Sequence, residues 1–95
     1  MALTTFLHDP DAGPLDYLID WSDWLETSDA LDTATWTITG DDEVLERTDD
    51  YVNATATSIW VQGGTAGVVY NASVHVVTTG GREDERSIDI RVLER

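Results

Sequence analysis

Two histidines and many carboxylates are the side chains of this sequence that could do acid–base or nucleophilic chemistry. His8 lies near the N-terminus, and His75 lies on the outward side of an alternating segment. Nucleophilic catalysis of the Ser-His-Asp type needs a serine beside a histidine that an acid orients. Neither histidine lies near a Gly-x-Ser-x-Gly turn. The spacing therefore predicts solvent-facing or interface histidines and no catalytic residue.

Adjacent acids occur at residues 41–43, 49–50 and 83–85. A glycosidase needs two carboxylates of unequal acidity across a cleft, which a small β domain rarely offers. A calcium loop needs oxygen ligands at regular spacing, and residues 29–32 and 41–43 lack that spacing. With 19 acidic residues among 95, neighbouring acids arise by chance. The carboxylates therefore predict an acidic surface, with no enzyme activity, metal or cofactor.

The glycine-rich run GGTAG at residues 63–67 could suggest a phosphate-binding loop, but no lysine follows it and no helix is expected after it. It precedes an alternating segment that begins near Tyr70. In immunoglobulin-like domains a tyrosine at this position returns its hydroxyl to nearby backbone, forming a tyrosine corner. We expect such a corner from Gly64, Gly67 and Tyr70, with a simple core role for Tyr70 as the alternative.

Charge is the strongest compositional signal. Five basic residues, all arginine, oppose the 19 acids and give a net charge of −14. Such a surface repels nucleic acid and anionic membranes. In molar salt the screening length falls to about 3 Å, and the repulsion within the protein nearly vanishes. The acidity therefore favours a halophilic setting. A GC-rich genome would also explain arginine in place of lysine, and a basic partner would also explain the acidity.

Other compositional features limit the class of protein. The chain has no cysteine, so disulfides and cysteine-based metal sites are excluded. It has no apolar run long enough to cross a bilayer and no basic-then-apolar leader. We therefore expect a chain made in the cytoplasm that does not bind membranes.

The elements that must position these side chains are expected to be strands. Alternating or β-branched segments cover residues 15–21, 33–39, 43–47, 55–61, 68–79 and 86–93, with turn signals between them. Residues 22–26 could form one helical turn, and no longer helical period occurs. The pattern predicts an immunoglobulin-like β-sandwich of about six to seven antiparallel strands over residues 15–95. Its last strand, with Asp89 and Arg91 outward, could be a sheet edge.

Residues 1–14 are expected to form an N-terminal arm, because both prolines of the chain, Pro10 and Pro14, interrupt regular structure there. The arm is expected to be frayed or docked on a neighbour. Its Phe6, Leu7 and His8 are candidate contact residues.

Four tryptophans exceed what the core of a small sandwich needs, so one or two are expected to face a partner, where tryptophan is favoured as an anchor. The candidates are Trp21 and, above all, Trp24, which lies outside the alternating face of residues 15–21. The alternative is that Trp24 closes one end of the sandwich.

Several motifs resemble one family: DY at 16–17, DWSDWL at 20–25, SIWVQGGTAG at 58–67 and GGREDERSI at 80–88. They are similar to small immunoglobulin-like proteins encoded among the structural genes of tailed phages and haloviruses, which are labelled as fibre or head-associated proteins. The resemblance covers about residues 7–95. It implies a virion protein without enzymatic activity, made in the host cytoplasm.

The first functional hypothesis is a capsid decoration or minor head protein that binds the major capsid protein or other virion proteins, with self-association also open. The alternatives are a neck, tail or fibre component, and a carbohydrate- or receptor-binding module. No nucleic-acid or membrane partner is expected.

Overall fold

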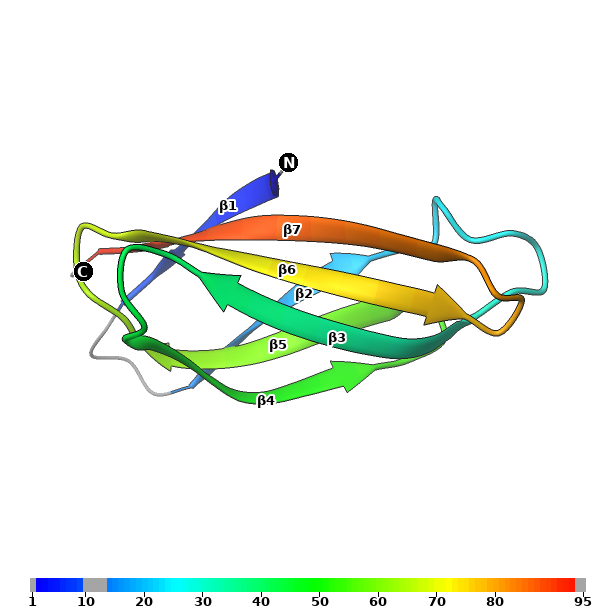
Figure 1. Ribbon diagram of the computed structural model, residues 1–95, viewed down its shortest axis with the longest axis horizontal. Coiled ribbons are helices and arrows are strands. Elements are labelled where there is room, and N and C mark those ends of the chain that lie inside the picture. The colour runs from blue at the N-terminus through cyan, green and yellow to red at the C-terminus, as the bar shows by residue number, and fades with distance from the viewer. Residues whose placement is uncertain (1, 10–13, 94–95) are drawn as a thin grey trace.

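The computed structural model describes residues 2–9 and 14–93, which contain seven strands and no helix. The strands form two facing sheets (Figure 1). Their bounds are β1 Ala2–His8, β2 Leu15–Asp20, β3 Leu31–Thr39, β4 Leu45–Val52, β5 Ala56–Gly63, β6 Val69–Thr78 and β7 Glu83–Val92. The described residues include no helix long and apolar enough to span a membrane.

The strand order is that of an immunoglobulin-like sandwich. One sheet has the order β1-β7-β6-β3 and the other has the order β2-β5-β4. In immunoglobulin-like domains the third strand and the last two strands share one sheet, and the second, fourth and fifth strands share the other. The same division is present here, with β3, β6 and β7 in one sheet and β2, β4 and β5 in the other. The predicted all-β sandwich is therefore confirmed, with one difference: β1 pairs with β7 in parallel, whereas the other pairs are antiparallel.

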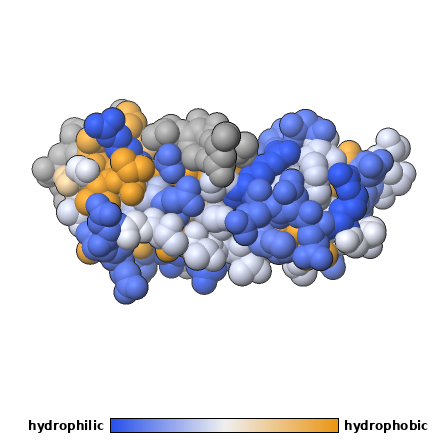
Figure 2. All heavy atoms as spheres, turned by 45° about the horizontal axis from the view of Figure 1, so that its top comes forward, coloured by the Kyte–Doolittle hydropathy of each residue, from blue (hydrophilic) through white to orange (hydrophobic). Residues whose placement is uncertain are grey.

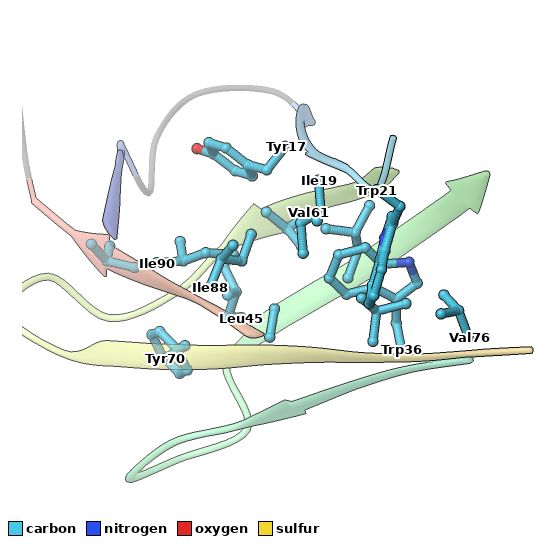
Figure 3. Packing of buried hydrophobic residues seen from close by; sticks show 14 of the residues in the cluster. Tyr17, Ile19, Trp21, Trp36, Leu45, Val61, Tyr70, Val76, Ile88 and Ile90 are labelled. Carbon is cyan, nitrogen blue, oxygen red and sulfur yellow. The ribbon is translucent and has the colours of Figure 1, made fainter. Parts of the chain in front are cut away.

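Alternation along the strands builds the core between the two sheets. In β6 every second side chain from Tyr70 to Val76 is fully buried, and so are Ile88, Ile90 and Val92 of β7. Burying an aliphatic or aromatic side chain of this size stabilises the fold by about 1.5–3 kcal/mol. Figure 3 shows the aromatic side chains among the aliphatic ones. The largest rings of this core are the indoles of Trp21 and Trp36, followed by the phenol rings of Tyr17 and Tyr70.

The N-terminal segment differs from the expected arm. Residues 2–8 form β1, which runs beside β7 with Phe6 opposite Ile90 and His8 opposite Val92. The Leu93 N–H also donates to the His8 carbonyl at 2.9 Å. Residues 2–8 are therefore a strand of the domain's own sheet, whereas an arm that is frayed or docked on a neighbour was expected. Pro14 lies outside the strands, on the connection to β2, as expected, whereas Pro10 and the rest of residues 10–13 lie outside the described part.

Three further local predictions differ from the structure. β4 begins at Leu45 and continues through Asp49 and Asp50, where a turn was expected. β7 lies between β6 and β1, so it is not a sheet edge. The single helical turn expected near residues 22–26 is present, since the Leu25 N–H donates to the Trp21 carbonyl at 3.2 Å, but Asp20 and not Ser22 caps it: the Asp20 carboxylate accepts from the Ser22 N–H at 2.9 Å.

Candidate partner-binding surface

The predicted contact residues of the N-terminal segment have three different environments. His8 is fully buried, and its Nδ1 lies 2.8 Å from the Tyr17 hydroxyl. Burial lowers the pKa of His8, against a smaller opposing effect of Asp9. Phe6 packs on Tyr17 with 4.9 Å between ring centroids. Leu7 is exposed, so it is the only one of the three whose side chain faces solvent freely.

Trp21 is not available as an anchor, because its side chain is fully buried. Its indole N–H donates to Thr57 Oγ1 at 3.0 Å, and the Arg86 guanidinium lies 4.3 Å from the ring centroid. Thr57 and Arg86 come from β5 and β7, so Trp21 joins the two sheets. The sequence around Trp21 does not reveal that residues from two other strands, Thr57 and Arg86, enclose its ring.

Trp24 is half-buried at the same end of the molecule. Its ring meets Trp21 edge-on, with 5.4 Å between centroids, and the Arg82 guanidinium lies 4.4 Å from the ring on another side. Arg82 also donates to the Trp24 carbonyl at 3.1 Å. Cation–π contacts of this kind stabilise by about 0.5–2 kcal/mol. This is the arrangement of a residue that closes the end of the sandwich.

The glycine-rich corner is held by hydrogen bonds to the hydroxyl of Tyr70. The Thr65 N–H donates to the Tyr70 hydroxyl at 3.0 Å, and that hydroxyl donates to Asp42 Oδ1 at 2.5 Å. The hydrogen bond from Tyr70 is the main cause of the lowered pKa of Asp42. Gly64 and Gly67 both have positive φ, and a Cβ on Gly64 would lie 2.7 Å from Val92 Cγ2. The corner thus ties the β3–β4 connection to the β5–β6 connection.

The remaining carboxylates do not form a reactive centre in the described part of the chain. His75 Nε2 lies 2.9 Å from Glu83 Oε1 on the exposed outer side of the sheet. No three histidine or acidic side chains among residues 2–9 and 14–93 gather as a metal site would require.

The outer side of the three-stranded sheet carries an apolar surface that the sequence did not reveal. Leu18 of β2 and Tyr51 of β4 lie opposite Ser58 of the central strand, and they are 54% and 56% exposed. The half-buried Trp60 lies in the next outward position of β5. We call Leu18, Tyr51, Ser58 and Trp60 the Leu18–Tyr51 face. A hollow of about 260 Å³ opens there, lined by Leu18, Tyr51, Val52, Asn53, Ala56, Thr57 and Ser58.

Acidic residues border this face. Asp16 of β2 and Asp49 of β4 lie on either side of Trp60. The Tyr51 hydroxyl donates to Asp49 Oδ2 at 2.7 Å, which lowers the pKa of Asp49 and raises that of Tyr51. The one arginine of β4, Arg47, is paired with Asp50 at 2.7 Å. The border is therefore negative at neutral pH and complements a positively charged partner.

Sequence reasoning missed this face for identifiable reasons. Leu18 lies outside the inward alternation of β2, which was used only to find the core. Tyr51 follows two aspartates that suggest a turn, so it was not placed on a strand. Trp60 lies between the inward Ile59 and Val61, and the alternation of β5 was the one signal that could have placed it outside.

A model of a known protein family matches most of the chain. Residues 8–91 match the model of a family described as podophage GP4 fiber-tail adaptor protein gp77. The matched range runs from the end of β1 to the penultimate residue of β7, so it includes both sheets, the corner and the Leu18–Tyr51 face. No curated protein matches the chain.

Proposed function

The chain belongs to the podophage GP4 fiber-tail adaptor family, and we propose that it is a virion protein that links a fibre protein to the tail. The proposal follows the family description and replaces capsid decoration as the leading hypothesis, because that description refers to the tail and the fibre. It includes no enzymatic step. The protein acts by fitting its surface to neighbouring virion proteins after synthesis in the host cytoplasm.

The Leu18–Tyr51 face is the observation that carries this proposal. Tyrosine and tryptophan are enriched at the centres of protein interfaces, where a rim of polar residues excludes water. Here Tyr51 and Trp60 lie with Leu18 inside a border of carboxylates. A fibre or tail protein that presents an apolar side chain with lysine or arginine around it would complement both parts of the face.

A carbohydrate-binding role is less well supported by the tryptophans. Stacking on sugar rings needs an aromatic ring open to solvent. Trp21 and Trp36 are buried, Trp24 lies against Arg82, and Trp60 is half-buried in the middle of a sheet. A protein partner that covers the whole face can contact the exposed part of the half-buried Trp60 ring without any rearrangement.

The proposal is tested by assembling virions with the double variant Leu18→Glu/Tyr51→Glu. Both side chains are more than half exposed, so the domain should fold, which circular dichroism would verify. We expect the variant to be missing from purified particles or to assemble without fibres, as judged by quantitative mass spectrometry of the fibre protein. Val69→Glu is the matched control, because Val69 is 48% exposed on the other sheet. Normal fibre content with the folded double variant would contradict the proposal.

A further inference from the structure

From Thr33 to Thr39, β3 is a sheet edge without the usual features that prevent strand pairing, since the charged Asp32 and the register shift lie before Thr33. It has β6 on one side only and is the last strand of its sheet. Residues 33–39, TATWTIT, contain no charge, proline or glycine and are rich in β-branched residues. Their pairing with β6 is regular, since the register shift lies before Thr33. A long, uncharged, regular edge presents a row of free backbone donors and acceptors to another strand.

The other sheet edges differ from β3. β4 has charged residues along its length and a register shift between Arg47 and Asp49. β2 is short and carries Asp16 and Asp20. β1 has a register shift between Ala2 and Thr5. Charges, short length and bulges are the devices by which proteins protect edges, and among the described edge strands residues 33–39 of β3 form the longest regular stretch without them.

A groove lies beside this edge. It has a volume of about 500 Å³ and is lined by Trp36, Thr37, Ile38, Glu43, Leu45, Glu46 and Arg47. Its apolar lining therefore comes from both β3 and β4, the two edge strands on this side of the sandwich. The indole N–H of Trp36 is buried and has no hydrogen-bond acceptor among the described residues. Trp36 thus contributes apolar surface to the groove and carries, beneath that surface, a donor that nothing in the described part of the domain satisfies.

We propose that the β3 edge accepts an extended segment of a second virion protein, which pairs with residues 33–39 as a fifth strand of the β1-β7-β6-β3 sheet. Main-chain hydrogen bonds to β3 would give affinity, and alternate side chains entering the groove would give specificity, as in other strand-addition complexes. Apolar side chains of the segment lie over Ile38 and Leu45. Basic side chains meet Glu43 and Glu46.

The occupant is a different protein and not a second copy of this chain. Two copies would each bring a net charge of −14, and their edges would bring Glu43 and Glu46 together. A segment that alternates apolar and basic residues removes this repulsion. The identification of the partner as a virion protein rests on the proposed adaptor function, and the β3 edge supplies a contact separate from the Leu18–Tyr51 face.

The test uses overlapping synthetic peptides that span the head, tail and fibre proteins of the same virus. They are titrated against the full chain while amide exchange is followed by NMR. We expect a tail or fibre peptide with alternating apolar and basic residues to bind and to slow exchange of β3 amides by about tenfold or more. The Trp36 indole N–H resonance should shift in the same titration.

A second form of that peptide, N-methylated at alternate backbone positions, keeps every side chain and removes the main-chain donors. We expect it to bind at least about tenfold more weakly, because several hydrogen bonds are lost. Equal binding of the methylated peptide, protection at another edge, or no binding by any peptide would overturn strand addition at β3.

The two proposals fail in different ways. Pairing at β3 by a head-protein peptide would support strand addition and contradict the tail position. The Leu18→Glu/Tyr51→Glu variant is expected to bind the peptide normally, because the Leu18–Tyr51 face belongs to the other sheet. Loss of peptide binding in this folded variant would show that the peptide occupies that face, and would overturn the assignment to β3.

Discussion

The outer sides of the two sheets differ in composition although both sheets share one core. On the four-stranded sheet, Thr37 and Ser73 form an outward row of small polar side chains, with Val69 as an exposed apolar residue elsewhere on this sheet. Figure 2 views the molecule partly from this side, where blue and white surface covers most of the length and orange gathers at one end. On the three-stranded sheet, Leu18 and Tyr51 stand exposed in one row.

Hydrogen bonds between side chains occur on both outer sides. His75 binds Glu83 and Asn71 binds Asp89 on the four-stranded side, and Tyr51 binds Asp49 on the three-stranded side. The contrast therefore lies in the exposed apolar surface of Leu18 and Tyr51. The comparison teaches that inward residues specify the sandwich, whereas the outward residues of one sheet carry the contact surface. Each prediction below tests this division.

The largest expected effect is on a residue that joins the sheets from inside. Trp21→Ala removes a buried ring together with its contacts to Thr57 and Arg86, and we expect it to lower the free energy of unfolding by about 3–5 kcal/mol. Leu18→Ala, on the outer side, should change it by no more than about 0.5 kcal/mol. Urea denaturation measures both. Similar losses for the two variants would contradict the division.

Two tyrosines offer a smaller, matched test, since the hydroxyl of each donates to an aspartate. Tyr70→Phe loses a buried hydroxyl that also accepts from the Thr65 N–H, and we expect a loss of about 1–2 kcal/mol in unfolding free energy. Tyr51→Phe loses its exposed bond to Asp49, with a clearly smaller effect in the same denaturation experiment. A larger effect at Tyr51 would mean that the Leu18–Tyr51 face stabilises the fold.

The sequence predicted the inward residues better than the outward ones. Alternation from Tyr70 to Val76 and from Ile88 to Val92 indicated strands directly, because one side of each strand is buried. β1 was missed since its parallel pairing with β7 depends on contacts remote in sequence. β4 was placed too short because Asp49 and Asp50 are typical of turns, although a bulge accommodates them in the sheet.

Candidate contact residues could be predicted only in part. Leu7 is exposed as a contact residue must be, whereas the structure encloses His8 and Trp21 in the interior. Tryptophan content alone does not distinguish a ring covered by an arginine, as in Trp24, from a half-buried ring on the outer side of a sheet, as in Trp60. That distinction depends on which strands are neighbours.

A charge substitution tests the acidic border of the Leu18–Tyr51 face. We expect Asp16→Lys to weaken binding to the purified fibre protein by about tenfold at physiological salt, because it places a cation opposite a basic partner. In 1 M salt the screening length is about 3 Å and the difference should nearly disappear. Glu85→Lys, on the other sheet, is the control. Surface plasmon resonance at several salt concentrations measures both, and equal weakening would contradict the role of the border.

The smallest expected effect concerns a carboxylate that supports the fold and lies away from the Leu18–Tyr51 face. Asp29 accepts hydrogen bonds from the Thr79 hydroxyl and the Gly80 N–H. Hydrogen bonds from Thr78 and Thr79 are the main causes of the lowering of its pKa from 3.8 to about 2. Since the folded-state pKa is the lower one, this stabilisation is complete above about pH 4 and is lost as the pH falls through about 2.

Asp29→Asn should therefore flatten the acid limb of the stability curve between pH 4 and 2. Urea denaturation at a series of pH values, compared with the unchanged chain, measures this. Fibre attachment at neutral pH should remain normal in the variant. An unchanged acid limb would show that the hydrogen bonds of Asp29 do not stabilise the folded state.

The central claim is that this chain is an adaptor at the tail. Quantitative mass spectrometry of purified virions, with the major capsid protein as the reference, tests it most directly. The account predicts a small number of copies per particle, in a simple ratio to the fibre protein. A ratio near one copy per capsid subunit would make the protein a capsid decoration, and absence from the particle would contradict a virion role altogether.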